Sequence, residues 1–243
     1  MSLLAAIGCL TIMPVGPRSP SPESLGASFF WFPLVGVGLG GVLAAAHLLL
    51  AQALPALVAA GVVLALWIVL TGALHLDGLG DCCDGLYGGT TPAERLRIMK
   101  DPHAGAMAVI GIVVILMLKW AALANSPLMT RGRDLVLIAC LGRYAMVVMG
   151  STLPYARAEG GTAQEFVRHA KGWALAGATL WSLVIAGWQG WRGLGLLGAA
   201  LLVALVLRWL FHRTLGGVTG DALGATCELT EATLLVIASG HIP

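Results

Sequence analysis

The stretch "LVAAGVVLALWIVLTGALHLDGLGDCCDG" (57–85) joins an apolar run directly to a dense group of carboxylates. Its first part, 57–74, contains no charged residue and is typical of the middle of a membrane helix, which needs about 20 mostly apolar residues to cross a bilayer. Three of the chain's 12 acidic residues then follow within 77–84. The stretch therefore predicts a membrane protein with a polar site at the end of one span.

Composition supports this class for the whole chain. Hydrophobic residues make up 58% and charged residues 11%, against about 25% charged in soluble domains, and the mean hydropathy is +0.88. We predict an all-α fold: one polytopic membrane helix bundle spanning 1–243. The net charge is only +2 and the basic residues are scattered, which argues against nucleic-acid binding.

Hydropathy predicts about seven transmembrane spans, at 29–52, 55–76, 104–124, 134–154, 172–189, 193–211 and 222–239. The segment before Pro14 lacks the basic start and the cleavage site of a signal peptide, and it is short for a span. It predicts an additional interfacial helix.

The 5 cysteines fit no zinc or disulfide spacing and are expected to be free thiols.

The distribution of Lys and Arg over the connections predicts the orientation of the bundle. One side would hold eight of them, in the N-terminal segment and the connections 77–103, 155–171 and 212–221, and the other side only Arg131, Arg133 and Arg192. The first side is then cytoplasmic. It contains both the aspartate-rich stretch and the "GGVTGD" stretch (216–221).

Asp77, Asp81 and Asp84 follow an i, i+4, i+7 pattern, which places them on one face of a helix. Three like charges beside a low-dielectric region need a compensating cation. Carboxylate oxygens favour a hard ion, above all Mg²⁺, which proteins commonly hold together with substrate phosphates. The alternatives are a solvated acidic loop and a zinc site made by His75 with Cys82 or Cys83.

The next segment, "PAERLRIMKDPHAG" (92–105), begins like a helix, with Thr91 as the cap and Pro92 in the first turn. Arg95 and Lys100 are candidates to bind phosphate oxygens. The alternative is a cytoplasmic helix with basic residues on its solvated face.

A second candidate region is "LGGVTGDALGATCELTEA" (215–232), where Gly217 allows a tight backbone beside Asp221. Glu228 lies seven residues after Asp221 and shares its helix face. Glu228 is either part of the site or a structural partner between helices. Arg143, in the middle of a span, either pairs with a membrane acid such as Glu228 or binds an entering anion. Lys119 is expected to snorkel from a span end.

Four motifs, in this order along the chain, resemble the cobalamin synthase family: "FFWFPLVGVGLG" (29–40), "TGALHLDGLGDCCDGLYGG" (71–89), "ERLRIMKDPHAGAMAV" (94–109) and "LGGVTGDALGATCELTEA" (215–232). "LTIMPV" (10–15) and "YARAEG" (155–160) extend the resemblance over most of the chain.

This resemblance implies an enzyme of the bacterial inner membrane that joins adenosylcobinamide-GDP to α-ribazole, or to its 5′-phosphate, with release of GMP. It implies a requirement for Mg²⁺, and its motif aspartates correspond to Asp77, Asp81, Asp84 and Asp221.

The residue patterns and the family resemblance together give the candidate roles. Asp84 or Asp221 is the predicted general base. The predicted metal ligands are Asp77, Asp81, Asp84, Asp221 and Glu228, and the predicted substrate-binding residues are His75, Arg95, Lys100, Arg143 and Gly217.

Two other functions compete with this prediction. A CDP-alcohol phosphotransferase of lipid synthesis also places spaced aspartates at the end of a membrane helix, but its signature has an arginine and longer spacing than Asp77–Asp84. An ion-coupled transporter would use acids within the membrane, but inverted repeats are not visible in this sequence. Membrane enzymes of this size often assemble, so a homo-oligomer is a further expectation.

Overall fold

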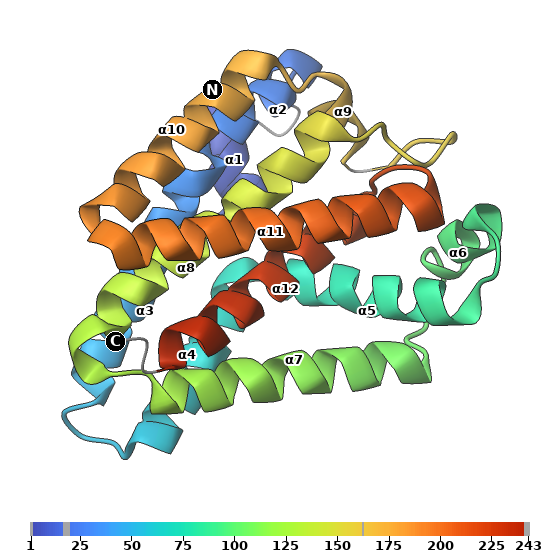
Figure 1. Cartoon of the computed structure of the whole chain (residues 1–243). Coiled ribbons are helices and arrows are strands. Elements are labelled where there is room, and N and C mark those ends of the chain that lie inside the picture. The colour runs from blue at the N-terminus through green and yellow to red at the C-terminus, as the bar shows by residue number, and fades with distance from the viewer. Residues whose placement is uncertain (1, 17–19, 162, 241–243) are drawn as a thin grey trace.

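The structure is a computed structural model that describes residues 2–16, 20–161 and 163–240 and shows a bundle of helices (Figure 1). Over these ranges no named strand is found, and Tyr155 and Val218 form an isolated parallel bridge. The helices are α1 (Ser2–Leu10), α2 (Pro22–Ser28), the 3₁₀ turn η1 (Phe29–Trp31), α3 (Phe32–Leu50), α4 (Ala56–Thr71), α5 (Leu74–Gly88), α6 (Pro92–Ile98), α7 (Ala106–Asn125), α8 (Leu128–Thr152), α9 (Gln164–Arg168), α10 (Gly172–Trp188), α11 (Gly190–Leu215) and α12 (Gly220–Ser239).

The predicted all-α membrane bundle is confirmed. Within the described residues, 5 helices are long and apolar enough to cross a membrane, and the number rises to 6 if the bent pair α4 and α5 forms one span. Helix α10 is apolar but shorter, and it corresponds to the predicted span at 172–189. The chain is thus a multi-pass membrane protein.

The predicted span at 55–76 is not one straight helix. Helix α4 ends at Thr71, and α5 leaves it at an angle of 88°. Gly72 (φ 61°) and Ala73 (φ 56°) are both left-handed, and their N–H groups bond to the carbonyl oxygens of Val69 and Ile68 at 3.0 Å. This is the Schellman arrangement that ends helices. The aspartates therefore lie on a separate helix whose direction is set by this turn.

Helices α8 and α12 form the centre of the bundle. Helix α8 packs against α3, α10, α11 and α12, and α12 also packs against α5 and α7. Figure 1 shows α12 crossing the middle of the molecule, with α7, α5 and α11 around it. Glu228 and Glu231, further along α12, are therefore enclosed by other helices rather than by lipid or water.

Small residues let α5 and the start of α12 touch through their backbones. A Cβ added at Gly78 would lie 2.8 Å from both the Cα and the carbonyl oxygen of Asp221. A Cβ at Gly224 would lie 3.0 Å from the Cα of His75. The aspartates of α5 are brought beside Asp221 by this close packing.

Substitution of Gly78 by Ala is expected to destabilise the protein. The new methyl group meets backbone atoms that cannot rotate away, and such overpacking costs about 1–3 kcal/mol. Thermal unfolding in detergent should show a lower Tm. Gly38→Ala in α3 is the matched control: a Cβ there meets nothing within 4 Å, and the change should raise helix stability by roughly 0.8 kcal/mol. Equal effects of the two variants would contradict the close approach.

Candidate active site

The predicted helical face of aspartates is present in α5. Asp77, Asp81 and Asp84 lie within Leu74–Gly88 at the predicted helical spacing. Glycines would weaken an isolated helix, but α5 is supported by contacts with α6, α7 and α12. Asp77, Asp84 and Asp221 all lie close enough to Asp81 for their negative charges to act on its carboxylate.

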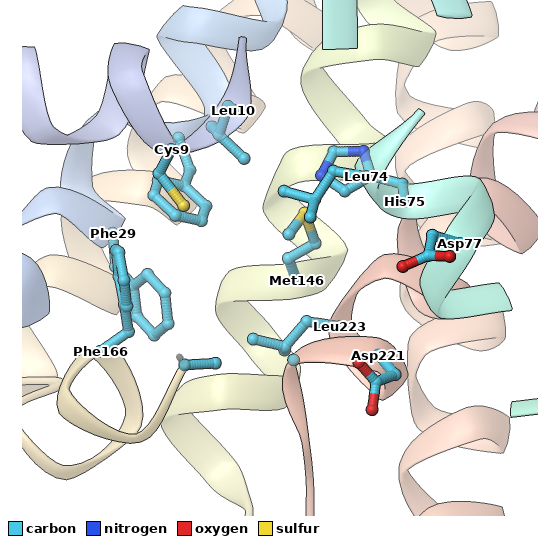
Figure 2. Close-up of a pocket in the computed structure, with 13 residues that line it drawn as sticks. Cys9, Leu10, Phe29, Leu74, His75, Asp77, Met146, Phe166, Asp221 and Leu223 are labelled. Atoms are coloured by element: carbon cyan, nitrogen blue, oxygen red, sulfur yellow. The ribbon is translucent and has the colours of Figure 1, made fainter. Parts of the chain in front are cut away.

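Asp221 joins this group from the first turn of α12. Thr219 caps the helix, and its hydroxyl accepts a bond from the N–H of Ala222 at 3.1 Å. Asp77 and Asp221 border the same cavity, of about 190 Å³. Figure 2 shows both carboxylates at one end of this cavity, on neighbouring turns of α5 and α12. The two motifs that were predicted to share a side therefore meet.

Arg157 is a site residue that the sequence analysis did not single out. Its Nη2 atom donates to Asp221 Oδ2 at 2.7 Å, and only 11% of its side chain is exposed. The chain beside it is fixed by the bridge with Val218, whose N–H donates to the Pro154 carbonyl oxygen at 2.9 Å. The "YARAEG" motif was the available signal, because it contains this arginine.

Close backbone packing at position 217 leaves room only for glycine. A Cβ there would collide with the carbonyl oxygen of Pro154, which belongs to the same bridge. Gly217 therefore lets the chain before α12 pair with the segment that carries Arg157. No contact in the structure tests its predicted role in substrate binding.

Asp77 also borders a second cavity, of about 340 Å³. Asp77, Asp81, Lys100 and Asp101 contribute to its walls. Lys100 also forms an exposed ion pair with Glu159, and the hydrogen bond it donates lowers the pKa of that carboxyl. Asp77 thus borders both a largely apolar cavity and one lined by charged groups.

Asp84 faces the start of α7 rather than either of these cavities. Its two oxygens accept bonds from the N–H groups of Gly105 at 2.6 Å and Ala108 at 2.9 Å. A carboxylate stabilises a helix N-terminus in this position. Asp84 therefore has a structural role whether or not it also takes part in chemistry.

The carboxylates fit a magnesium ion by their chemistry, but they do not form a complete coordination shell. Among residues 2–16, 20–161 and 163–240, no group of three or more His, Cys, Asp or Glu side chains is placed to hold a metal ion. Mg²⁺ usually takes one or two carboxylates and completes its shell with water and phosphate oxygens. Asp77 and Asp81, at the walls of the charged cavity, suit that mode of binding.

Comparison with known proteins shows the family of the chain. The sequence profile of the family described as "Cobalamin-5-phosphate synthase" matches residues 2–239. The chain belongs to this family. It is thereby a transferase of cobalamin biosynthesis.

Its relatives match over nearly their whole length. A protein of Ectopseudomonas mendocina (strain ymp) is 43% identical over 240 residues, which cover 96% of each chain. One from Chlorobaculum tepidum is 38% identical over 250 residues, with 98% of this chain and 94% of the relative covered. One from Pseudomonas entomophila (strain L48) is 42% identical over 237 residues, 95% of each. All three are named adenosylcobinamide-GDP ribazoletransferase. No solved structure matches the chain.

In this member of the cobalamin-5-phosphate synthase family, Arg95 connects helices. Thr91 caps α6 as predicted, because its hydroxyl accepts from the Glu94 N–H at 3.3 Å. The Arg95 guanidinium donates to the carbonyl oxygens of Gly89 and Thr214, each at 3.1 Å. It ties α6 to the end of α11, and this contact does not place it at a phosphate.

A buried group of four charges lies deeper in the bundle. Lys119 donates to Glu228 Oε2 and Glu231 Oε2, each at 2.6 Å, and Arg143 pairs with Glu231 Oε1. Each of the four side chains is 7% exposed or less. The expectation that Lys119 snorkels is wrong, because Lys119 turns inward and also lies 4.8 Å from the ring centre of Trp67.

This group also decides between the alternatives left open for Glu228 and Arg143. Glu228 is a structural partner of Lys119, and seven residues of α-helix place it about 10 Å along the axis from Asp221. It does not join the aspartates as the predicted metal ligand. Arg143 pairs with a membrane acid, but the acid is Glu231 rather than Glu228. Its Nε and Nη2 atoms have no partner among the described residues.

Proposed function

We propose that this chain transfers the cobinamide phosphate of adenosylcobinamide-GDP to α-ribazole, or to α-ribazole 5′-phosphate, and releases GMP. The observation that carries the proposal is the meeting of the α5 aspartates with Asp221 beside Arg157 and Lys100, in a chain of this family. Carboxylates and cations gathered at two cavities that share Asp77 suit a diphosphate substrate, since phosphoryl transfer depends mainly on positioning and charge neutralisation.

The reaction is a displacement at phosphorus. A ribose hydroxyl of α-ribazole attacks the phosphorus on the cobinamide side of the diphosphate. A new P–O bond forms, the bond to the bridging oxygen breaks, and GMP leaves with that oxygen. The hydroxyl proton passes to a carboxylate. Of the two candidate bases, Asp221 is better placed, because both oxygens of Asp84 already accept backbone N–H groups.

The remaining charged groups would hold the diphosphate. Arg157, next to Asp221, and Lys100, at the wall of the charged cavity, supply cations for phosphate oxygens. Asp77 and Asp81 would hold Mg²⁺, which when bound neutralises charge on the diphosphate. Lys100 would have to exchange Glu159 for substrate, which costs little because the pair is exposed.

We place this site on the cytoplasmic side of the bacterial inner membrane. Arg95 and Arg157 lie with the aspartates at one end of the bundle, where α11 ends and α12 begins. Arg192 lies at the other end, where it pairs with Asp134 at 3.0 Å and donates to the carbonyl oxygen of Ala238. The larger number of basic residues at the aspartate end supports the cytoplasmic orientation.

The test is a reaction with the purified full chain in detergent, adenosylcobinamide-GDP, α-ribazole and Mg²⁺. We expect GMP and a product with a cobalamin absorption spectrum in equal amounts, loss of turnover with EDTA, and recovery when Mg²⁺ is added back in excess. CDP-alcohol substrates are the control and should not react. Folded protein that releases no GMP would refute the transferase proposal, and turnover unaffected by EDTA would refute the metal requirement.

A further inference from the structure

The cavity bordered by Asp77 and Asp221 has two chemically different ends. Figure 2 shows the carboxylates at one end and Phe29 and Phe166 at the other, with Met146 and Leu223 between them. The aromatic end is a packed cluster, because the ring centres of Phe29 and Phe166 are 6.0 Å apart. Helix α1 contributes Leu10 to the same end. An occupant would therefore have an apolar part and a polar part.

One polar side chain in this wall has no partner. His75 is 2% exposed, and neither of its ring nitrogens has a hydrogen-bond partner among the described residues. An unpaired buried polar atom costs about 1–3 kcal/mol. A ligand atom recovers that free energy only if the ring turns toward the cavity, because both nitrogens are covered in the structure. With the ring turned in this way, the wall offers one hydrogen bond away from the carboxylates, within the part that is otherwise apolar.

The volume of about 190 Å³ suits a small ring system. A cavity of about 150 Å³ lined by apolar side chains holds one benzene molecule, so a bicyclic ring fits here and the corrin ring does not. Guanine would bury several donors and acceptors against Phe29, Phe32 and Phe166, where they would stay unpaired. Benzimidazole has an apolar carbon edge and a single free ring nitrogen.

We infer that this cavity binds the benzimidazole base of α-ribazole, with His75 hydrogen-bonded to the base and the phenylalanine end around its carbon edge. The inference rests on the proposed function, because it assigns a place to one of its two substrates. With the base in the cavity, the ribose lies at the end formed by Asp77 and Asp221. The nucleophilic hydroxyl is then next to Asp221, the proposed general base. The diphosphate is left to the charged cavity that Asp77 also borders.

The first measurement uses the unmodified protein and free 5,6-dimethylbenzimidazole as the probe. We expect the free base to inhibit competitively against α-ribazole and not competitively against adenosylcobinamide-GDP. His75→Leu, which keeps the size but removes the ring nitrogens, should raise the KM for α-ribazole and the Ki of the free base by about tenfold, the factor that corresponds to 1.4 kcal/mol. His75→Gln, which keeps polar atoms, should recover part of this loss.

Ala163→Phe is the second variant, because it fills the cavity from the loop before α9. It should raise the KM for α-ribazole at least tenfold and leave the KM for adenosylcobinamide-GDP within about twofold. His47→Leu is the matched control, because His47 is equally buried but bonds to Arg131, away from the cavity. The KM of this variant for α-ribazole should not change.

The outcomes separate this inference from the proposed function. A protein that forms no cobalamin refutes the proposed function. The second outcome is that the unmodified protein turns over normally and that His75→Leu and Ala163→Phe both keep its KM for α-ribazole. This outcome refutes the benzimidazole site alone. Competition of the free base with adenosylcobinamide-GDP would also refute it.

Discussion

Asp77→Asn is expected to reduce the rate of GMP release by about a thousandfold, with similar losses for Asp81→Asn and Asp221→Asn. The amide keeps the size of the side chain but removes the negative charge and the basic oxygen. Loss of one group that acts on the reacting atoms typically costs about 10² to 10⁴ in rate. The measurement is GMP release at saturating Mg²⁺, with the Tm of each variant as a check on folding.

The control for these variants is Glu23→Gln, which changes an exposed carboxylate in the first turn of α2 and should leave turnover unchanged. Asp84→Asn is informative in a different way. Because Asp84 accepts N–H groups at the start of α7, this variant should lose about 1 kcal/mol of stability. Its loss of turnover should be smaller than that of the Asp77 variant. Near-normal turnover in all of the Asp77, Asp81 and Asp221 variants would refute the site.

Lys119→Met is expected to cause the largest loss of stability, about 3–5 kcal/mol. The substitution leaves Glu228 and Glu231 buried with Arg143 as their only remaining cation in the group. Removing one partner from a buried pair leaves a charge without compensation, which costs more than the pair itself contributes. Denaturant unfolding of the purified protein in detergent measures the loss.

A double variant distinguishes charge balance from simple loss of packing. Lys119→Met combined with Glu228→Gln removes one charge of each sign, so it should recover much of the stability lost in the single variant. Lys171→Met, at an exposed lysine before α10, should stay within about 0.5 kcal/mol of the unmodified protein. A double variant that is less stable than the single one would contradict the role assigned to Lys119.

The sequence was informative where a local pattern determines the structure. The i, i+4, i+7 spacing of Asp77, Asp81 and Asp84 predicted a helical face, and α5 confirms it. Hydropathy predicted the bundle, because a bilayer-crossing helix must be mostly apolar over about 20 residues. The break at Gly72 and Ala73 was missed because the apolar run continues through it. A glycine at that point is a recognised C-terminal signal, but the left-handed Ala73 has no signature in sequence.

The long-range contacts of the site could not be predicted in the same way. Arg157 meets a partner 64 positions away through an irregular segment that has no periodicity. Lys119 was expected near the membrane surface because only its depth along a span can be read from hydropathy. The side of α7 from which it projects depends on where α12 packs. The same uncertainty left Arg143 open between a membrane acid such as Glu228 and an entering anion.

The four buried charges have a consequence for the aspartate at the head of α12. Glu228 and Glu231 hold the middle of this helix to Lys119 and Arg143, while Asp221 stands about two turns away. A slip of α12 by one position would turn it by about 100° and pull both glutamates away from their cations. Ion pairs in the bilayer interior thus fix the rotational register in which Asp221 is presented to water.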